Sequence, residues 1–174
     1  VLAGNASAPV KTSGLRSSAR VTNSIIEGMG GVICVGADTL APGSPFYFAF
    51  NTFIFTMQDG GQACDYSTSF SRDIRFENNV FFATSSANVA AGPGWANCGL
   101  KNNLLFPQAD ARVSNTVGDP KFVDAAAKNY HLQLGSPALN TAVPSTGLST
   151  SHDYDGAARP QGVAHDIGAF ERTP

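Results

Sequence analysis

The sequence predicts an all-β protein, a right-handed parallel β-helix of about four coils with an irregular C-terminal cap. Three observations support this fold. The chain is rich in turn formers, with 18 Gly and 10 Pro among 174 residues. It contains no long amphipathic helical pattern, and its apolar runs are short and bounded by turn residues. Finally, a short motif built around asparagine recurs at a spacing typical of solenoids.

The recurring motif reads apolar, variable, Asn, small or polar, and then two adjacent apolar residues. Four segments fit it without gaps: 21–26, 49–54, 76–81 and 100–105. Their anchors are Asn23, Asn51, Asn78 and Asn102, which are 28, 27 and 24 residues apart. Because a flat strand would not place two adjacent apolar side chains on one face, the motif predicts a bend at the asparagine.

Asparagine suits such a bend because it tolerates left-handed backbone angles better than other non-glycine residues. When identical bends stack about 4.8 Å apart, each side-chain amide can bond the amides above and below it. The sequence therefore predicts an asparagine ladder along the coil. The side chains expected to stack inside the coil are Val21, Ile25, Phe53, Phe76, Val80, Leu100 and Leu104.

The loops between the motifs, 36–45, 59–68 and 85–97, are rich in small residues and are expected to project from one side and to carry any binding surface. An antiparallel sandwich is the alternative fold. It is disfavoured because Asp59-Gly60 is the one two-residue hairpin turn near a motif junction.

Charge and hydropathy limit the partners. The net charge is -2, charged residues make up 14%, and there is no basic run, so neither nucleic acid nor an anionic membrane surface is expected as a partner. The apolar runs are too short for a membrane span. The chain begins at Val1 without a methionine or an apolar leader, which predicts either a processed product or a fragment.

Three cysteines, Cys34, Cys64 and Cys98, lack the spacing of a zinc site. They allow one disulfide in three pairings if the protein is in an oxidising compartment. The alternative is three buried small apolar side chains.

Beyond Asn115 the motif stops, and the chain divides into predicted coils at 1–115 and a predicted capping segment at 116–174. A solenoid needs a cap because its open end exposes core and unpaired strand edges. The tail contains GDPKFVD at 118–124, YHLQLGSPAL at 130–139, DYDG at 153–156 followed by RP at 159–160, and DIGAFE at 166–171.

These tail segments closely resemble the C-terminal end of secreted bacterial right-handed β-helix proteins of the pectate-lyase-like superfamily, often with a choice-of-anchor type of tail. The resemblance implies a secreted or cell-surface location and a polysaccharide or surface glycan as partner. The superfamily includes polysaccharide lyases, polysaccharide hydrolases and surface proteins without a known reaction, so fold alone does not fix function. Its members usually have more coils, which implies that further coils or a second copy cover the N-terminal end.

A lyase needs a group that neutralises a uronate carboxylate, usually Ca²⁺ held by carboxylates, and an Arg or Lys base. The candidates are Arg72, Asp73 and Arg75, with Lys101 expected to stand over Glu77 on the solvent face of the next coil. Such a row could bind an acidic sugar. The alternative reading is an exposed ladder of ion pairs.

Other candidates lie in the loops. A hydrolase would use a carboxylate pair such as Asp59 and Asp65, although loop aspartates more often form turns. Tyr66 and Trp95 are the candidate glycan-binding rings, since exposed aromatic side chains stack on sugar faces.

The tail carboxylates are interpreted mainly as structural. Asp153 and Asp155 stand in an Asp-x-Asp-Gly sequence that resembles the start of a calcium loop, but the later ligands of that loop do not follow. Turn and cap roles are favoured over a Ca²⁺ site, and Arg159 is expected to bond an aspartate. The three histidines, His131, His152 and His165, lack a nucleophile motif and are interpreted as structural.

The sequence thus favours an extracellular β-helix module with a structural or polysaccharide-binding role. Two alternatives are kept: a polysaccharide lyase or glycoside hydrolase of the same fold, and a subunit that assembles into a filament through its open end.

Overall fold

The computed structural model describes residues 2–3, 10–12, 19–28, 33–35, 45–55, 74–84, 98–107, 114–145, 148 and 150–173. Its strands are β1 (Leu2–Ala3), β2 (Val10–Thr12), β3 (Ala19–Thr22), β4 (Ile25–Gly28), β5 (Ile33–Val35), β6 (Phe46–Ala49), β7 (Thr52–Phe55), β8 (Ile74–Glu77), β9 (Val80–Ala83), β10 (Cys98–Lys101), β11 (Leu104–Phe106), β12 (Thr116–Val117), β13 (Phe122–Asp124) and β14 (Asn129–Leu132).

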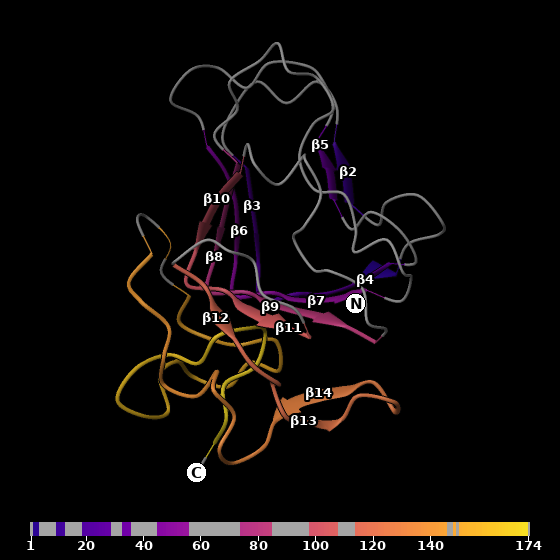
Figure 1. Ribbon diagram of the computed structural model, residues 1–174. Helices are drawn as coiled ribbons and strands as arrows, with labels where there is room; N and C mark the ends of the chain where they lie inside the picture. Colours follow the sequence, from indigo (N-terminus) through magenta and orange to yellow (C-terminus); the bar gives the residue numbers. More distant parts are fainter. Residues whose placement is uncertain are drawn as a thin grey trace.

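The strands form stacked parallel sheets (Figure 1). A six-stranded sheet has the order β1-β4-β7-β9-β11-β12, and a four-stranded sheet has the order β10-β8-β6-β3. All of their pairings are parallel. Each coil passes from the four-stranded to the six-stranded sheet through a two-residue corner. The predicted all-β parallel β-helix with an irregular C-terminal cap is confirmed.

The strand register gives the corner two columns, one residue apart. In the first column Asn23, Phe50, Asn78 and Asn102 all have left-handed backbone, with φ between 48° and 57°. The second column contains Ser24, Asn51, Asn79, Asn103 and Asn115. The predicted asparagine ladder exists. Of the four predicted anchors, Asn51 lies in the second column, and the other three lie in the first column, where Asn102 donates to Asn78 at 2.8 Å.

Side-chain amide hydrogen bonds run without a break along this second column from Asn51 to Asn115. The side-chain Nδ2 of Asn51 donates to Oδ1 of Asn79 at 3.1 Å, Asn79 donates to Asn103 at 2.9 Å, and Asn103 to Asn115 at 3.0 Å. Each Oδ1 also accepts the backbone N–H of the preceding rung at 3.0 Å. Asn51, Asn79 and Asn103 have no exposed surface, so these bonds offset the cost of burying their polar groups.

The coil interior is an aromatic core. Phe48 stacks on Phe76 with ring centroids 4.9 Å apart, and Phe53 stacks on Phe81 at 4.8 Å. Edge contacts such as Phe76 against Phe81 at 5.7 Å join the two stacks. Val21, Phe53, Phe76 and Leu100 lie in this core as predicted. Ring pairs of this geometry add about 0.5–1.5 kcal/mol each beyond the area they bury.

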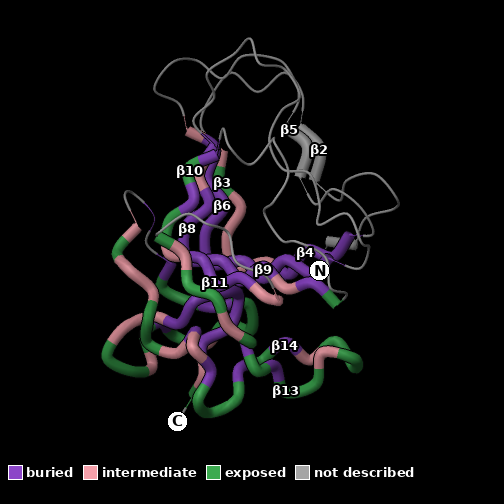
Figure 2. The backbone as a smooth tube through the Cα atoms, viewed as in Figure 1, coloured by how far each residue is buried: buried purple, intermediate pink, exposed green. Residues whose placement is uncertain are grey.

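Three predicted interior residues lie elsewhere. Ile25, Val80 and Leu104 face outward from the six-stranded sheet into a second core, where they pack against tail residues such as Phe122 and Ile167. The two adjacent apolar residues of the motif therefore point to opposite faces of the sheet. Both faces are buried because the tail covers the outer one, as the purple strands of Figure 2 show.

The tail lies along the coils rather than only across their end. Glu27 on β4 accepts hydrogen bonds from Tyr130 at 2.6 Å and Lys128 at 2.8 Å. Burial of Glu27 alone would raise its pKa, but the bonds from Lys128 and Tyr130 outweigh burial and hold the pKa below its ordinary value. Since β12 also extends the six-stranded sheet past residue 115, the tail is part of the same packed body.

Candidate functional site

Cations gather on the outer face of the four-stranded sheet. The register places Arg20, Tyr47 and Arg75 in one column, with Ala19, Val21 and the other flanking side chains pointing into the core. Arg75 donates from Nη1 to the Tyr47 hydroxyl at 3.2 Å, and its guanidinium lies 5.5 Å from the centre of that ring. Such cation–π contact holds a guanidinium in place while leaving part of it in water.

Lys101 stands beside Glu77 on the next coil, as the sequence predicts. Glu77 was expected to face solvent, but it is only 4% exposed because the tail covers it, and its carboxylate accepts a hydrogen bond from the Ser145 hydroxyl. Lys101 is exposed and donates to the Pro144 carbonyl at 3.3 Å. Lys101 and Glu77 therefore do not pair as the exposed ion-pair reading expected, and Arg20, Arg75 and Lys101 are the charged side chains that the described part of this face leaves at least partly exposed.

Several candidates lie outside the described residues: Arg72, Asp73, Asp59, Asp65, Tyr66 and Trp95, together with the side chains of Cys34 and Cys64. Their roles stay predictions.

The tail carboxylates are engaged by backbone groups. Asp153 accepts the N–H groups of Asp155 at 2.9 Å, Ala157 at 2.8 Å and Glu171 at 2.8 Å. The Asp155 carboxylate contacts Nε2 of His131 at 2.7 Å. Within the described residues, no group of three or more His, Cys, Asp or Glu side chains has the arrangement of a metal site.

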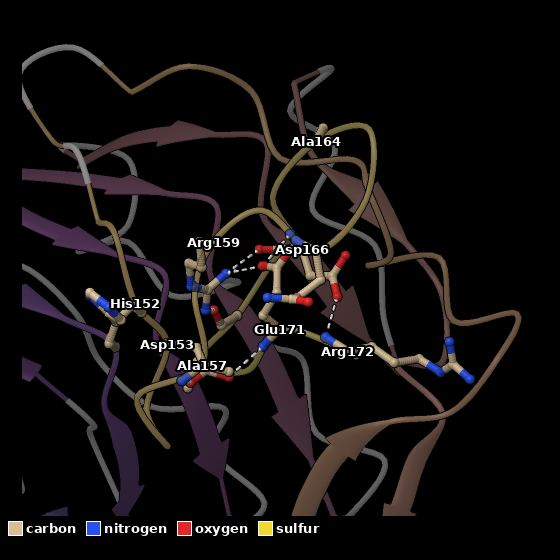
Figure 3. A network of polar contacts seen from close by, with 12 residues as sticks. His152, Asp153, Ala157, Arg159, Ala164, Asp166, Glu171 and Arg172 are labelled. Atoms are coloured by element: carbon tan, nitrogen blue, oxygen red, sulfur yellow. Dashed lines mark hydrogen bonds and ion pairs between the residues drawn. The ribbon is translucent and has the colours of Figure 1, made fainter. Parts of the chain in front are cut away.

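Arg159 is at the centre of a buried ionic network (Figure 3). Its Nη1 lies 2.9 Å from Oε2 of Glu171 and also donates to the backbone carbonyl of Asp166 at 3.0 Å, while Nη2 donates to the backbone carbonyl of Gly168 at 2.7 Å. Arg159 thus bonds a glutamate where the sequence analysis expected an aspartate carboxylate. Burial lowers the pKa of Arg159 and raises that of Asp166. The guanidinium also lies 5.1 Å from the Phe50 ring, which ties the tail to the coil corner.

Two surface depressions adjoin the tail. One, of about 370 Å³, has Phe50, Leu148, Pro160 and His165 in its lining. The other, of about 340 Å³, lies between the six-stranded sheet and the β13–β14 hairpin, and its lining includes Phe82 and Phe106. Sequence reasoning missed both. The sequence signal for the second depression was the pair Phe82 and Phe106, which occupy the same position after two successive motifs.

Comparisons with protein-family models, with curated proteins and with solved structures find no match for this chain. The stacked parallel sheets, the buried asparagine ladder and the aromatic stacks place this chain in the class of parallel β-solenoids. In the described part of the chain there is no helix long and apolar enough to cross a membrane.

Proposed function

We propose that this protein is an extracellular β-helix module of the pectate-lyase-like type, with a rigid structural body that contacts acidic polysaccharide. The observation that carries the proposal is the row of Arg20, Arg75 and Lys101 on one face, with Tyr47 between the two arginines. Arg20 and Arg75 share one column with Tyr47, and Lys101 lies on the next strand in the adjacent column, beside Glu77. Because neighbouring strands of the sheet are about 4.8 Å apart, the three cations spread along the coil axis, as a polymer ligand requires.

The charge of the row favours an anionic partner. Glu77, the carboxylate among the described residues of this face, is covered by the tail, which reduces the repulsion that a uronate group would meet. Guanidinium groups pair with carboxylates through two parallel hydrogen bonds, and Arg75 is already oriented by its aromatic neighbour. Exposed ion pairs of this kind are individually weak, so binding depends on several contacts along the polysaccharide.

An extracellular location agrees with the cysteine chemistry. Cys98 is disulfide-bonded, and its partner lies outside the described residues. Disulfides persist in oxidising compartments. Mass measurement of the natural product before and after reduction would test this, because a reduced Cys98 in the mature protein would contradict the assignment.

The binding test uses the full chain and two uronate polymers, polygalacturonate and alginate, with neutral dextran as the comparison. We expect binding to the uronate polymers that weakens as salt is raised. Changing Arg20, Arg75 and Lys101 together to glutamine should reduce affinity at least about tenfold, the equivalent of about 1.4 kcal/mol. Three single changes of the same kind should each have a smaller effect.

The control is Arg172→Gln, which removes the same kind of charge in the tail, where the Arg172 side chain points away from the buried network (Figure 3). The proposed site would be refuted if dextran bound as tightly as the uronate polymers, or if Arg172→Gln reduced affinity as much as the triple substitution. Formation of an unsaturated uronate product would instead establish the lyase alternative, new reducing ends without unsaturation would establish a hydrolase, and fibres seen by electron microscopy would establish the filament subunit.

A further inference from the structure

The 340 Å³ groove has an aromatic floor. Phe82 on β9 and Phe106 on β11 stack with ring centroids 5.7 Å apart and planes inclined by 11°. Phe122, at the start of the β13–β14 hairpin, meets Phe82 edge-on at 5.2 Å and 68°. The hairpin lies beside the six-stranded sheet (Figure 1), so the stacked pair and the edge-on ring of Phe122 together line the groove.

These two floor rings are more accessible than their neighbours in the same column. The register aligns Glu27, Ile54, Phe82 and Phe106 on the outer face of the six-stranded sheet. The tail buries the first two, with Glu27 9% and Ile54 2% exposed, but leaves the two phenylalanines only half-buried. Large aromatic side chains left partly open inside a concave surface are typical of ligand sites.

The rim of the groove supplies hydrogen-bonding groups of both charge signs. Asp119, Lys121 and Gln133 are exposed and line it. One oxygen of Asp119 accepts the backbone N–H of Lys121 at 2.8 Å, and the Gln133 amide nitrogen donates to the Phe122 carbonyl at 2.9 Å. These bonds hold the Asp119 and Gln133 side chains, while the second Asp119 carboxylate oxygen and the side-chain oxygen of Gln133 have no further hydrogen bond among the described residues. Acceptors and an ammonium donor therefore surround an apolar floor.

We infer that this groove binds a pyranose ring of a neutral sugar, as a chain end or branch. A pyranose has an apolar C–H face that packs on aromatic rings and a rim of hydroxyls that both donate and accept. The volume lies at the small end of the range for ligand pockets, which suits one or two sugar rings. Because the rim carries one carboxylate and one ammonium, its charges offset each other, and a neutral ligand is favoured over a uronate. The site is separate from the cation row on the four-stranded sheet.

The test is saturation-transfer NMR on the full chain with the methyl glycosides of galactose, glucose, mannose and N-acetylglucosamine, and with methyl galacturonoside as the charged comparison. At least one neutral glycoside should receive saturation, mainly on the protons of one ring face. Phe106→Leu keeps an apolar side chain but removes the ring, and should weaken binding by about five- to tenfold. Gln133→Ala should also weaken glycoside binding, because it removes a hydrogen-bonding side chain from the rim.

The matched control is Leu134→Ala, which truncates an apolar side chain that is 78% exposed beside the groove without lining it. It should bind as the wild type does. The inference is overturned if no neutral glycoside receives saturation, if the uronoside binds more tightly, or if Phe106→Leu binds like the control. Polyuronate binding measured on the same variants separates the two sites, since Phe106→Leu should leave it unchanged whether or not the cation row functions.

Discussion

Asn79 is the rung at which the ladder can be tested most directly. Its side chain has no exposed surface and makes four hydrogen bonds. The amide nitrogen donates to Oδ1 of Asn103 and to the Phe48 carbonyl, both at 2.9 Å. Its Oδ1 accepts from the backbone N–H of Asn51 at 3.0 Å and from the Asn51 side chain at 3.1 Å. Replacement by alanine removes all four bonds and leaves polar partners buried.

The magnitude follows from those partners. The buried N–H of Asn51 loses its acceptor, and an unsatisfied buried donor costs about 1–3 kcal/mol. The three other lost bonds contribute about 0.5–1.5 kcal/mol each when intact, although the remaining amides keep some of their partners. We expect Asn79→Ala to lower the free energy of unfolding by about 3–5 kcal/mol, a large share of the total of about 5–15 kcal/mol for a typical domain.

The matched variant is Asn102→Gly in the neighbouring corner column. Asn102 has a φ of 53°, which glycine adopts readily, and its partly exposed amide bonds only Asn78 and the Thr141 carbonyl. This variant should cost only about 1 kcal/mol. Urea unfolding followed by circular dichroism gives both values from the midpoint and slope. A cost of Asn79→Ala no larger than that of Asn102→Gly would refute the assignment of the two columns.

Three further predictions concern the contacts of the tail. Gly168→Ala should destabilise by about 2–3 kcal/mol, because φ is +99° and the new Cβ would lie 2.8 Å from a Val80 methyl carbon. Gly156→Ala, with φ +85° and nothing within 4 Å, should lower the melting temperature much less. Since tail contacts hold the pKa of Glu27 below 4.5, its carboxylate stabilises the fold fully above that pH and loses this effect as pH falls through the folded pKa. The difference in melting temperature between wild type and Glu27→Gln should therefore disappear in acid. A difference that stays constant with pH would contradict this role of the Glu27 carboxylate. Arg159→Ala leaves a buried carboxylate unpaired and should cost about 3–5 kcal/mol in urea unfolding, whereas an effect below about 1 kcal/mol would show that water replaces the guanidinium.

The repeat could be predicted from the sequence, but its register could not be fixed everywhere. Asn78-Asn79 and Asn102-Asn103 are doublets, one residue for each corner column. Segment 49–54 has one asparagine, which aligned equally well with either column. In the structure Phe50 takes the left-handed position with a φ of 56°, so Asn51 is the ladder rung. Aligning the core aromatics, Phe48 over Phe76, would have given the correct register, because stacked rings tolerate no shift of one residue.

The sequence also contains a signal for the covering of the outer face of the six-stranded sheet. Adjacent apolar residues such as Val80 and Phe81 were attributed to a bend that turns both inward. In a strand, neighbouring side chains point to opposite faces, and a sheet buried on both sides is apolar in continuous runs. The pair therefore required a second apolar layer, which the tail supplies. Which tail residues form that layer depends on contacts between positions distant in sequence, and local patterns do not encode them.

Asn78 explains why the corner column needs asparagine rather than glycine, although glycine would form the bend at lower cost. Its carboxamide bonds both peptide groups of Val143, accepting from N–H at 3.0 Å and donating to C=O at 2.9 Å. Its own backbone carbonyl accepts the N–H of Gly168 at 2.9 Å. One residue thus sets the turn of the coil and holds two separate segments of the tail. The neighbouring column joins coil to coil, and this column in addition joins the coils to the tail, so the bend and the attachment of the tail depend on the same side chains.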